Sequence, residues 1–95
     1  MTADATALPR QAQVLIELGD CHAARGEYDQ AEQQYRQARH VCPDHPDAWL
    51  SLGMLQLRQG RPRQALPSFT HALTVAPDST EACTGLGLCH QQLDA

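Results

Sequence analysis

The chain repeats itself at a constant spacing, and this restricts its possible folds more than any other feature. Gly19, Gly53 and Gly87 lie 34 residues apart, and each follows a leucine. The same spacing relates Leu15, Trp49 and Cys83, and also Ala31 and Ala65, Tyr35 and Phe69, Ala38 and Ala72, and Pro43 and Pro77. A fixed period of this length indicates a stack of similar units that bury their apolar faces against one another.

Each unit is predicted to be a pair of helices. Apolar residues recur at spacings of three and four, as in Leu66, Phe69 and Leu73, which is typical of a helix with one buried face. Gly26 and Gly60 are expected to end the first helix of each pair, because glycine adopts the left-handed conformation that closes a helix. A proline then ends each second helix.

Pro67 lies inside the second helix of the second unit, where it lacks the N–H that a helix needs. Either the helix begins near Pro62 and continues with a mild irregularity, or it begins late, near Leu66. The first alternative is favoured, because the apolar period continues through Phe69 and Leu73.

Small residues at repeated positions predict a close approach of the two helices in each unit. Gly19 is expected to face Ala31, and Gly53 to face Ala65. Gly87 has no such partner, because the sequence ends before a further helix.

The repeat resembles the tetratricopeptide repeat, whose signature runs W-x2-L-G-x2-Y, A-x3-F, A and P. The best copy is "WLSLGMLQ" followed by "ALPSFTHAL" and "APD". The resemblance covers one domain in residues 1–95, with repeats at about 12–45 and 46–79 and an unpaired last helix at about 80–93. It implies an all-α fold, a right-handed α-solenoid of antiparallel helix pairs with five helices in about two and a half repeats.

The charge and the termini argue against several classes of partner. The net charge is −4 and the seven arginines form no basic block, so nucleic acid is not expected as a partner. No apolar run is long enough for membrane insertion, and the N-terminus "MTADATALPR" has neither the positive start nor the apolar core of a signal peptide. We therefore expect a cytoplasmic protein with free thiols.

Two Cys-His pairs, Cys21 with His22 and Cys89 with His90, suggest a metal or redox site. The 34-residue period places Cys21, Leu55 and Cys89 at one structural position, so packing is the preferred interpretation. Two repeats separate the pairs by about 20 Å, which prevents them from sharing a zinc ion. If either cysteine reacts, we expect it to be Cys89, because the last helix lacks a covering partner.

No other cluster predicts a catalytic or metal site. His40, Cys42 and His45 lack a fourth ligand, and no nucleophile with an adjacent base is evident, so neither an enzyme nor a cofactor is expected. Tyr35 and Trp49 occupy signature core positions. The arginines of the second helices are interpreted as a solvated outer face, with a secondary partner as the alternative; they are Arg36, Arg39, Arg61 and Arg63.

The first helices of such a solenoid form a concave wall that binds extended ligands. The wall is predicted to carry an apolar stripe that repeat packing does not require, made of Ile16, Leu50, Met54, Leu57 and Leu88. Polar wall residues beside it are Glu17, Asp20, Asp47, Ser51, Arg58 and Glu81. This set predicts a groove for a peptide or amphipathic segment that combines apolar residues with Arg or Lys. The alternative is that chain termini or neighbouring molecules cover the stripe.

Some tetratricopeptide domains clamp the C-terminal carboxylate of heat-shock chaperones with Lys, Asn and Arg. The matching positions here are Ile16, Asp20, Ser51, Glu81 and Gly85. Because two acids stand where the resemblance would place cations and amides, we expect an acidic tail to be repelled.

Two other functions remain open at the level of sequence. The last helix would expose Leu86, Gly87, His90 and Leu93, so the chain could form a homo-oligomer through this end. The sequence also stops in mid-repeat at "QQLDA", which is compatible with the N-terminal adaptor of a longer enzyme.

Overall fold

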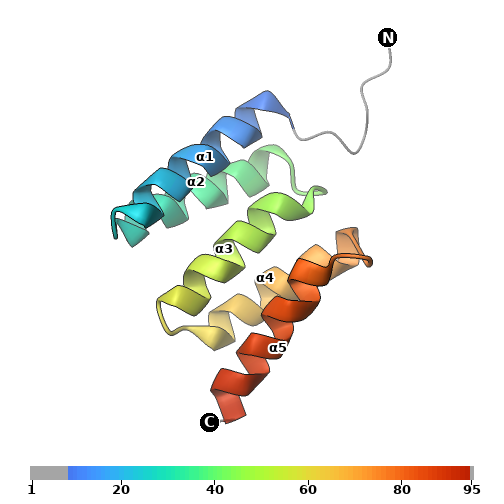
Figure 1. Cartoon of the computed structure of the whole chain (residues 1–95). Helices are drawn as coiled ribbons and strands as arrows, with labels where there is room; N and C mark the ends of the chain where they lie inside the picture. Colours follow the sequence, from blue (N-terminus) through green and yellow to red (C-terminus); the bar gives the residue numbers. More distant parts are fainter. Residues whose placement is uncertain (1–8, 95) are drawn as a thin grey trace.

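Five helices account for almost all of residues 9–94, the part of the chain that the computed structural model describes. They are α1 (Arg10–Ala24), α2 (Tyr28–Val41), α3 (Pro46–Arg58), α4 (Pro62–Val75) and α5 (Thr80–Asp94). Helices α1 and α2 form one antiparallel pair, α3 and α4 form the next, and α5 packs on the second pair (Figure 1). The predicted all-α solenoid is confirmed. Residues 1–8, which bear on the expected lack of a signal peptide, lie outside the described range.

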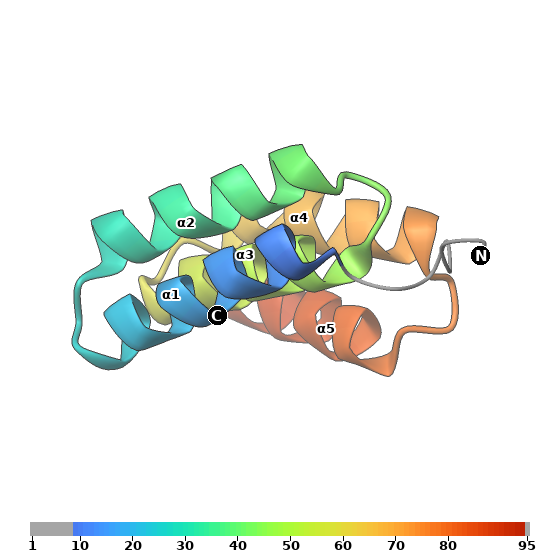
Figure 2. The same ribbon diagram turned by 90° about the horizontal axis from the view of Figure 1, so that it is seen from above.

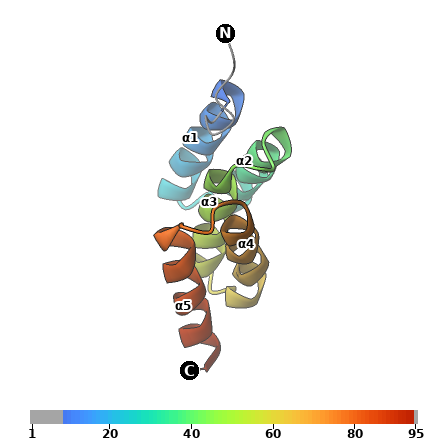
Figure 3. The same cartoon turned by 90° about the vertical axis from the view of Figure 1, so that its right-hand side faces the viewer.

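The helices form two layers, with α1, α3 and α5 in one and α2 and α4 in the other (Figure 2). The molecule extends over 50 × 30 × 16 Å, and the short dimension fits two layers of helices. Neighbouring helices contact each other in the first layer, whereas no Cα atoms of α2 and α4 lie within 8 Å of each other. The stack therefore curves toward the layer of α1, α3 and α5, and Figure 3 shows it from the side.

The helix ends follow the signals in the sequence. Gly26 and Gly60 have φ values of +78° and +73° and close the turns after α1 and α3, as predicted. The Ser79 hydroxyl accepts a hydrogen bond of 3.1 Å from the Ala82 N–H and caps α5. Helix α4 begins at Pro62 and continues through Pro67, which confirms the favoured alternative over a late start.

Aromatic rings fill the space beside the repeated glycines. A Cβ on Gly19 would lie 2.5 Å from Cε1 of Tyr35, and a Cβ on Gly53 would lie 2.8 Å from Cζ of Phe69. Ala31 and Ala65 were expected to face these glycines, and both are fully buried, but the nearest atoms to each glycine belong to the aromatic ring. The alanines lie one turn before the ring that needs the room, so each glycine serves to seat an aromatic side chain.

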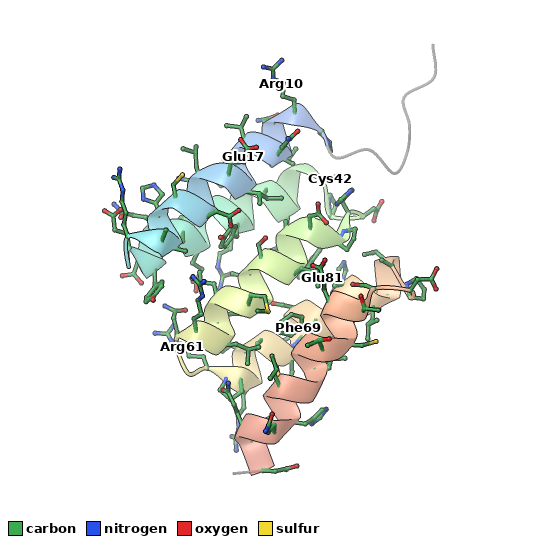
Figure 4. The ribbon with its side chains drawn as sticks, in the orientation of Figure 1. Arg10, Glu17, Cys42, Arg61, Phe69 and Glu81 are labelled. Atoms are coloured by element: carbon green, nitrogen blue, oxygen red, sulfur yellow. The ribbon has the colours of Figure 1, made fainter. Side chains whose placement is uncertain are left out.

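Phe69 is seated between two helices of the first layer. Its ring is fully buried, and it approaches Gly85 of α5 as well as Gly53 of α3 (Figure 4). A Cβ on Gly85 would lie 2.5 Å from both Cδ1 and Cζ of this ring. The 34-residue period did not reveal this contact, because Ser51 and Glu17 occupy the equivalent positions.

Candidate functional site

A cleft of about 550 Å³ opens on the concave side, between the first helices of the stack. Its lining comes mainly from α1 and α3, with one residue from α2 and one from the start of α5. The lining residues are Ile16, Asp20, Ala23, Ala24, Tyr35, Asp47, Leu50, Ser51, Met54, Leu55, Arg58 and Glu81. Three carboxylates and one guanidinium therefore surround a partly apolar floor.

The carboxylate of Asp20 is held in place by a hydrogen bond from a buried side chain. The Tyr35 phenol donates a hydrogen bond to Oδ1 of Asp20. Burial raises the pKa of Tyr35 well above its usual value, and the bond to Asp20 raises it further. The phenol therefore stays protonated as a donor, which fixes the direction of the Asp20 carboxylate on the cleft wall.

The other two carboxylates stand at helix starts. Asp47 lies in the first turn of α3 and Glu81 in the first turn of α5, and both are exposed. Figure 4 shows Glu81 near the start of α5. The positive end of the helix dipole stabilises negative charge at these positions. The single cation, Arg58, lies in the last turn of α3 and forms no ion pair within residues 9–94. The cleft thus carries excess negative charge.

The predicted apolar stripe is only partly available. Met54 is 45% exposed and lines the cleft, and Ile16 lines it as a half-buried residue. Leu50 and Leu57 are each only 8% exposed, because they pack into the core that α3, α4 and α5 share. The premise that packing does not require the stripe is therefore wrong for these two leucines, although Leu50 still contributes an edge to the cleft.

Two further predicted groove residues are exposed but lie outside the cleft lining. They are Glu17 on α1 and Leu88 on α5. The cleft therefore gathers Ile16, Asp20, Asp47, Leu50, Ser51, Met54, Arg58 and Glu81 out of the predicted set.

Comparison with known proteins agrees with the helical fold described above. A family model described as "Tetratricopeptide repeat" matches residues 10–78. The chain belongs to the tetratricopeptide repeat family. The crystal structure of the Sgt2 tetratricopeptide domain from Aspergillus fumigatus superimposes with a TM-score of 0.87 at 24% sequence identity. The match covers 98% of this chain and 62% of that one, and it supports the fold. No curated protein matches the sequence.

A tetratricopeptide domain is a protein-interaction module, and the cleft lies on the concave wall that such a stack presents. Within residues 9–94, no helix is long and apolar enough to cross a membrane. The same residues bring no three His, Cys, Asp or Glu side chains together in an arrangement that could hold a metal ion.

The two repeated cysteines differ in their environment. Cys89 is fully buried, and burial raises the pKa of its thiol, whereas Cys21 is exposed. This overturns the expectation that Cys89 is the more reactive of the two. Cys21, Leu55 and Cys89 share one repeat position, and this position faces the preceding repeat. The preceding repeat covers Leu55 and Cys89. Cys21 stays exposed, because no helix precedes α1 within the described residues.

The predicted self-association face lies on α5. Leu86 and Leu93 are half-buried there, while Gly87 and His90 are exposed. A Cβ on Gly87 would meet nothing within 4 Å, in contrast to Gly19 and Gly53. An aromatic ring fills the space beside Gly19 and Gly53, whereas the space beside Gly87 is empty; we call this space the open seat at Gly87.

Tyr35 is a core residue, as predicted, and its hydroxyl also contributes to the cleft, which was not predicted. A comparison of the two repeats could have indicated the contact between Tyr35 and Asp20. At the 34-residue offset, Phe69 replaces Tyr35 and Met54 replaces Asp20. The hydroxyl donor and its carboxylate acceptor are present together in one repeat and absent together in the other. Such paired replacement indicates a contact between the two positions.

Proposed function

We propose that the chain binds a segment of a partner protein in the concave cleft, and that this segment combines apolar residues with Arg or Lys. The observation that carries the proposal is the composition of the cleft. Three carboxylates surround it, one cation opposes them, and the flexible Met54 side chain is the most exposed apolar contact. The partner's basic residues complement the carboxylates, and its apolar residue covers Met54.

The fixed Asp20 carboxylate favours recognition of an arginine in particular. A guanidinium donates two parallel hydrogen bonds to a carboxylate whose orientation is already set, so little further ordering is needed. Asp47 and Glu81 are exposed and therefore act mainly by steering the approach of a basic segment. Binding should accordingly weaken as the salt concentration rises.

The test uses two fluorescently labelled peptide pools and anisotropy as the measure of affinity. One pool contains peptides in which Leu, Met or Phe is flanked by Arg, and the other has Glu in place of each Arg. We expect the Arg pool to bind and the Glu pool to fail. Equal binding of the two pools would contradict the proposal.

A matched pair of variants separates the cleft from the overall charge. Glu81→Lys reverses a charge in the first turn of α5, and Asp29→Lys does the same in the first turn of α2, away from the cleft. Glu81→Lys should weaken binding about tenfold, and Asp29→Lys about twofold or less, because a distant charge is screened. Equal losses would mean that net charge alone attracts the peptide.

Self-association through α5 is a second candidate, and the open seat at Gly87 favours it. Gly19 and Gly53 each lie under an aromatic ring, so Gly87 offers the same seat to a helix of a second copy. Light scattering over a range of concentrations tests this. A dimer should appear as the concentration rises, and Gly87→Glu should abolish it, while Gln92→Glu, an exposed change on another face of the same helix, should not. A constant monomer mass would dismiss this candidate.

A further inference from the structure

A second hollow lies on the opposite side of the molecule, between the two helices of the outer layer. No Cα atoms of α2 and α4 lie within 8 Å of each other, and a space of about 400 Å³ remains between these helices. It is lined by Glu32, Arg36, Arg39, Trp49, Gln56, Arg61, Gln64, Pro67 and Ser68. Arg36, Arg61 and Arg63 are exposed, in agreement with the predicted solvated face, and the first two of them border this hollow together with Arg39.

Two buried polar side chains line the hollow. Gln56 and Ser68 are each only 4% exposed, and they are the buried polar side chains of the described core. The Ser68 hydroxyl donates a hydrogen bond of 3.1 Å to Oε1 of Gln56. This bond occupies the oxygen of the Gln56 amide and leaves its N–H donors without a protein partner within residues 9–94. These donors are not enclosed by the core, so they are available to a ligand in the hollow that accepts hydrogen bonds.

The hollow carries an excess of positive charge in a chain whose net charge is −4. Arg36 and Arg39 extend from α2, and Arg61 stands at the start of α4; Figure 4 labels Arg61. Glu32 is the one acid in the lining, and it pairs with Arg36 at 3.3 Å. Three guanidinium groups and one carboxylate therefore leave a net charge of two in the lining of the hollow.

Arg39 is held beside the hollow by Trp49. Its guanidinium carbon lies 4.7 Å from the centre of the Trp49 ring, and the Trp49 indole in turn donates a hydrogen bond to the Pro43 carbonyl. Burial lowers the pKa of Arg39 and the neighbouring charge of Arg36 lowers it further, while the charge of Glu32 acts in the opposite direction. An anion bound between the two guanidinium groups would relieve this repulsion.

We propose that the hollow between α2 and α4 binds the phosphoryl group of a phosphorylated serine or threonine in a partner protein. A phosphomonoester carries a charge of about −1.5 to −2, which matches the net positive charge of the hollow's lining better than a single carboxylate does. Arginine forks pair with phosphoryl oxygens, and the Gln56 amide supplies a neutral donor. The site is separate from the acidic cleft, so one partner could present a basic segment to the cleft and a phosphorylated residue here.

Trp49 supplies the measurement, because it is the single tryptophan of the chain and it lines the hollow under Arg39. The tryptophan emission is followed while a phosphoserine peptide, its unphosphorylated form or inorganic phosphate is added. We expect a saturable change with the phosphopeptide, none with the unphosphorylated peptide, and the same change at higher concentration with inorganic phosphate. If inorganic phosphate binds as tightly as the phosphopeptide, a protein partner is not the natural ligand and the proposal fails.

Two neighbouring arginines provide matched variants. Arg61 lines the hollow and Arg63 does not, although both are exposed and lie at the start of α4. Arg61→Gln should weaken phosphopeptide binding about tenfold, which is the effect of losing one charge-assisted hydrogen bond, and Arg63→Gln should change it about twofold or less. Neither side chain caps the helix, so folding should persist, and circular dichroism checks this.

Equal losses in the two arginine variants would overturn the proposal, since they would show attraction to charge without a site. Met54→Gln separates this site from the concave cleft: it should leave phosphopeptide binding unchanged while it weakens binding of the Arg peptide pool. A phosphopeptide that depends on Met54 would place the phosphoryl group in the cleft and would also overturn the proposal.

Discussion

Adding one methyl group at each of two glycines in α5 should have opposite effects on stability. A Cβ on Gly85 would lie 2.5 Å from two carbon atoms of Phe69, whereas a Cβ on Gly87 would meet nothing within 4 Å. Carbon atoms normally approach to about 3.5 to 4.0 Å, so the Gly85 methyl group overlaps the ring by about 1 Å. The ring cannot move away easily, because it is fully buried and its other side faces Gly53.

The magnitudes follow from two effects. Replacing glycine by alanine inside a helix stabilises by about 0.5 to 1 kcal/mol, and this gain is common to both variants. The overlap at Gly85 adds a cost of about 1 to 3 kcal/mol, the usual penalty for overpacking a core. The difference in unfolding free energy between Gly85→Ala and Gly87→Ala therefore measures the steric cost alone.

Thermal unfolding followed by circular dichroism provides the assay, at low protein concentration so that association does not contribute. In a domain of this size, about 1 kcal/mol shifts Tm by about 4 to 8 °C. Gly87→Ala should raise Tm by a few degrees, and Gly85→Ala should fall below it by about 4 °C or more. If both variants are equally stabilised, Phe69 is not seated against α5 and the account of the core is wrong.

Three further predictions follow from the same structure. Because burial raises the pKa of Tyr35 above its ordinary 10.0, its phenol ionises first in the unfolded chain. The contribution of Tyr35 to stability should therefore be intact below pH 10 and decline as the pH rises above it, and alkaline unfolding should show a smaller decline in Tyr35→Phe. A thiol reagent should modify the exposed Cys21 at once and the buried Cys89 only on unfolding, which mass spectrometry of the labelled peptides would reveal; prompt labelling of Cys89 would contradict its burial. Met54→Glu should change the urea midpoint little, whereas Leu57→Glu should unfold the chain or destabilise it by about 3 kcal/mol or more, because it puts a charge among core side chains; similar midpoints would mean that Leu57 is exposed.

The 34-residue period was sufficient to predict the helices and the turns between them. Helix ends depend on local signals, such as the left-handed Gly26 and Gly60, and these lie in the sequence itself. Packing within one repeat was also partly accessible, because Gly53 and Phe69 recur with Gly19 and Tyr35 at the same offset. Local conformation, and part of the packing that recurs in each repeat, can therefore be predicted from the sequence.

What could not be predicted depends on neighbours that differ from repeat to repeat. Cys21 and Cys89 occupy one repeat position, yet only Cys89 has a preceding repeat to cover it. Leu57 was assigned to the concave wall, but the way α5 sits on α3 places it in the core. The hollow beside Arg39 arises because α2 and α4 diverge, and this separation is a property of the whole stack.

The most direct test of the concave cleft is a two-dimensional NMR titration of the isotopically labelled chain with a member of the Arg peptide pool. The account predicts that the largest shifts occur in the amides of Asp20, Met54 and Glu81, and that they saturate together. Shifts concentrated on the outer helices, or no saturable shift in the cleft, would contradict it.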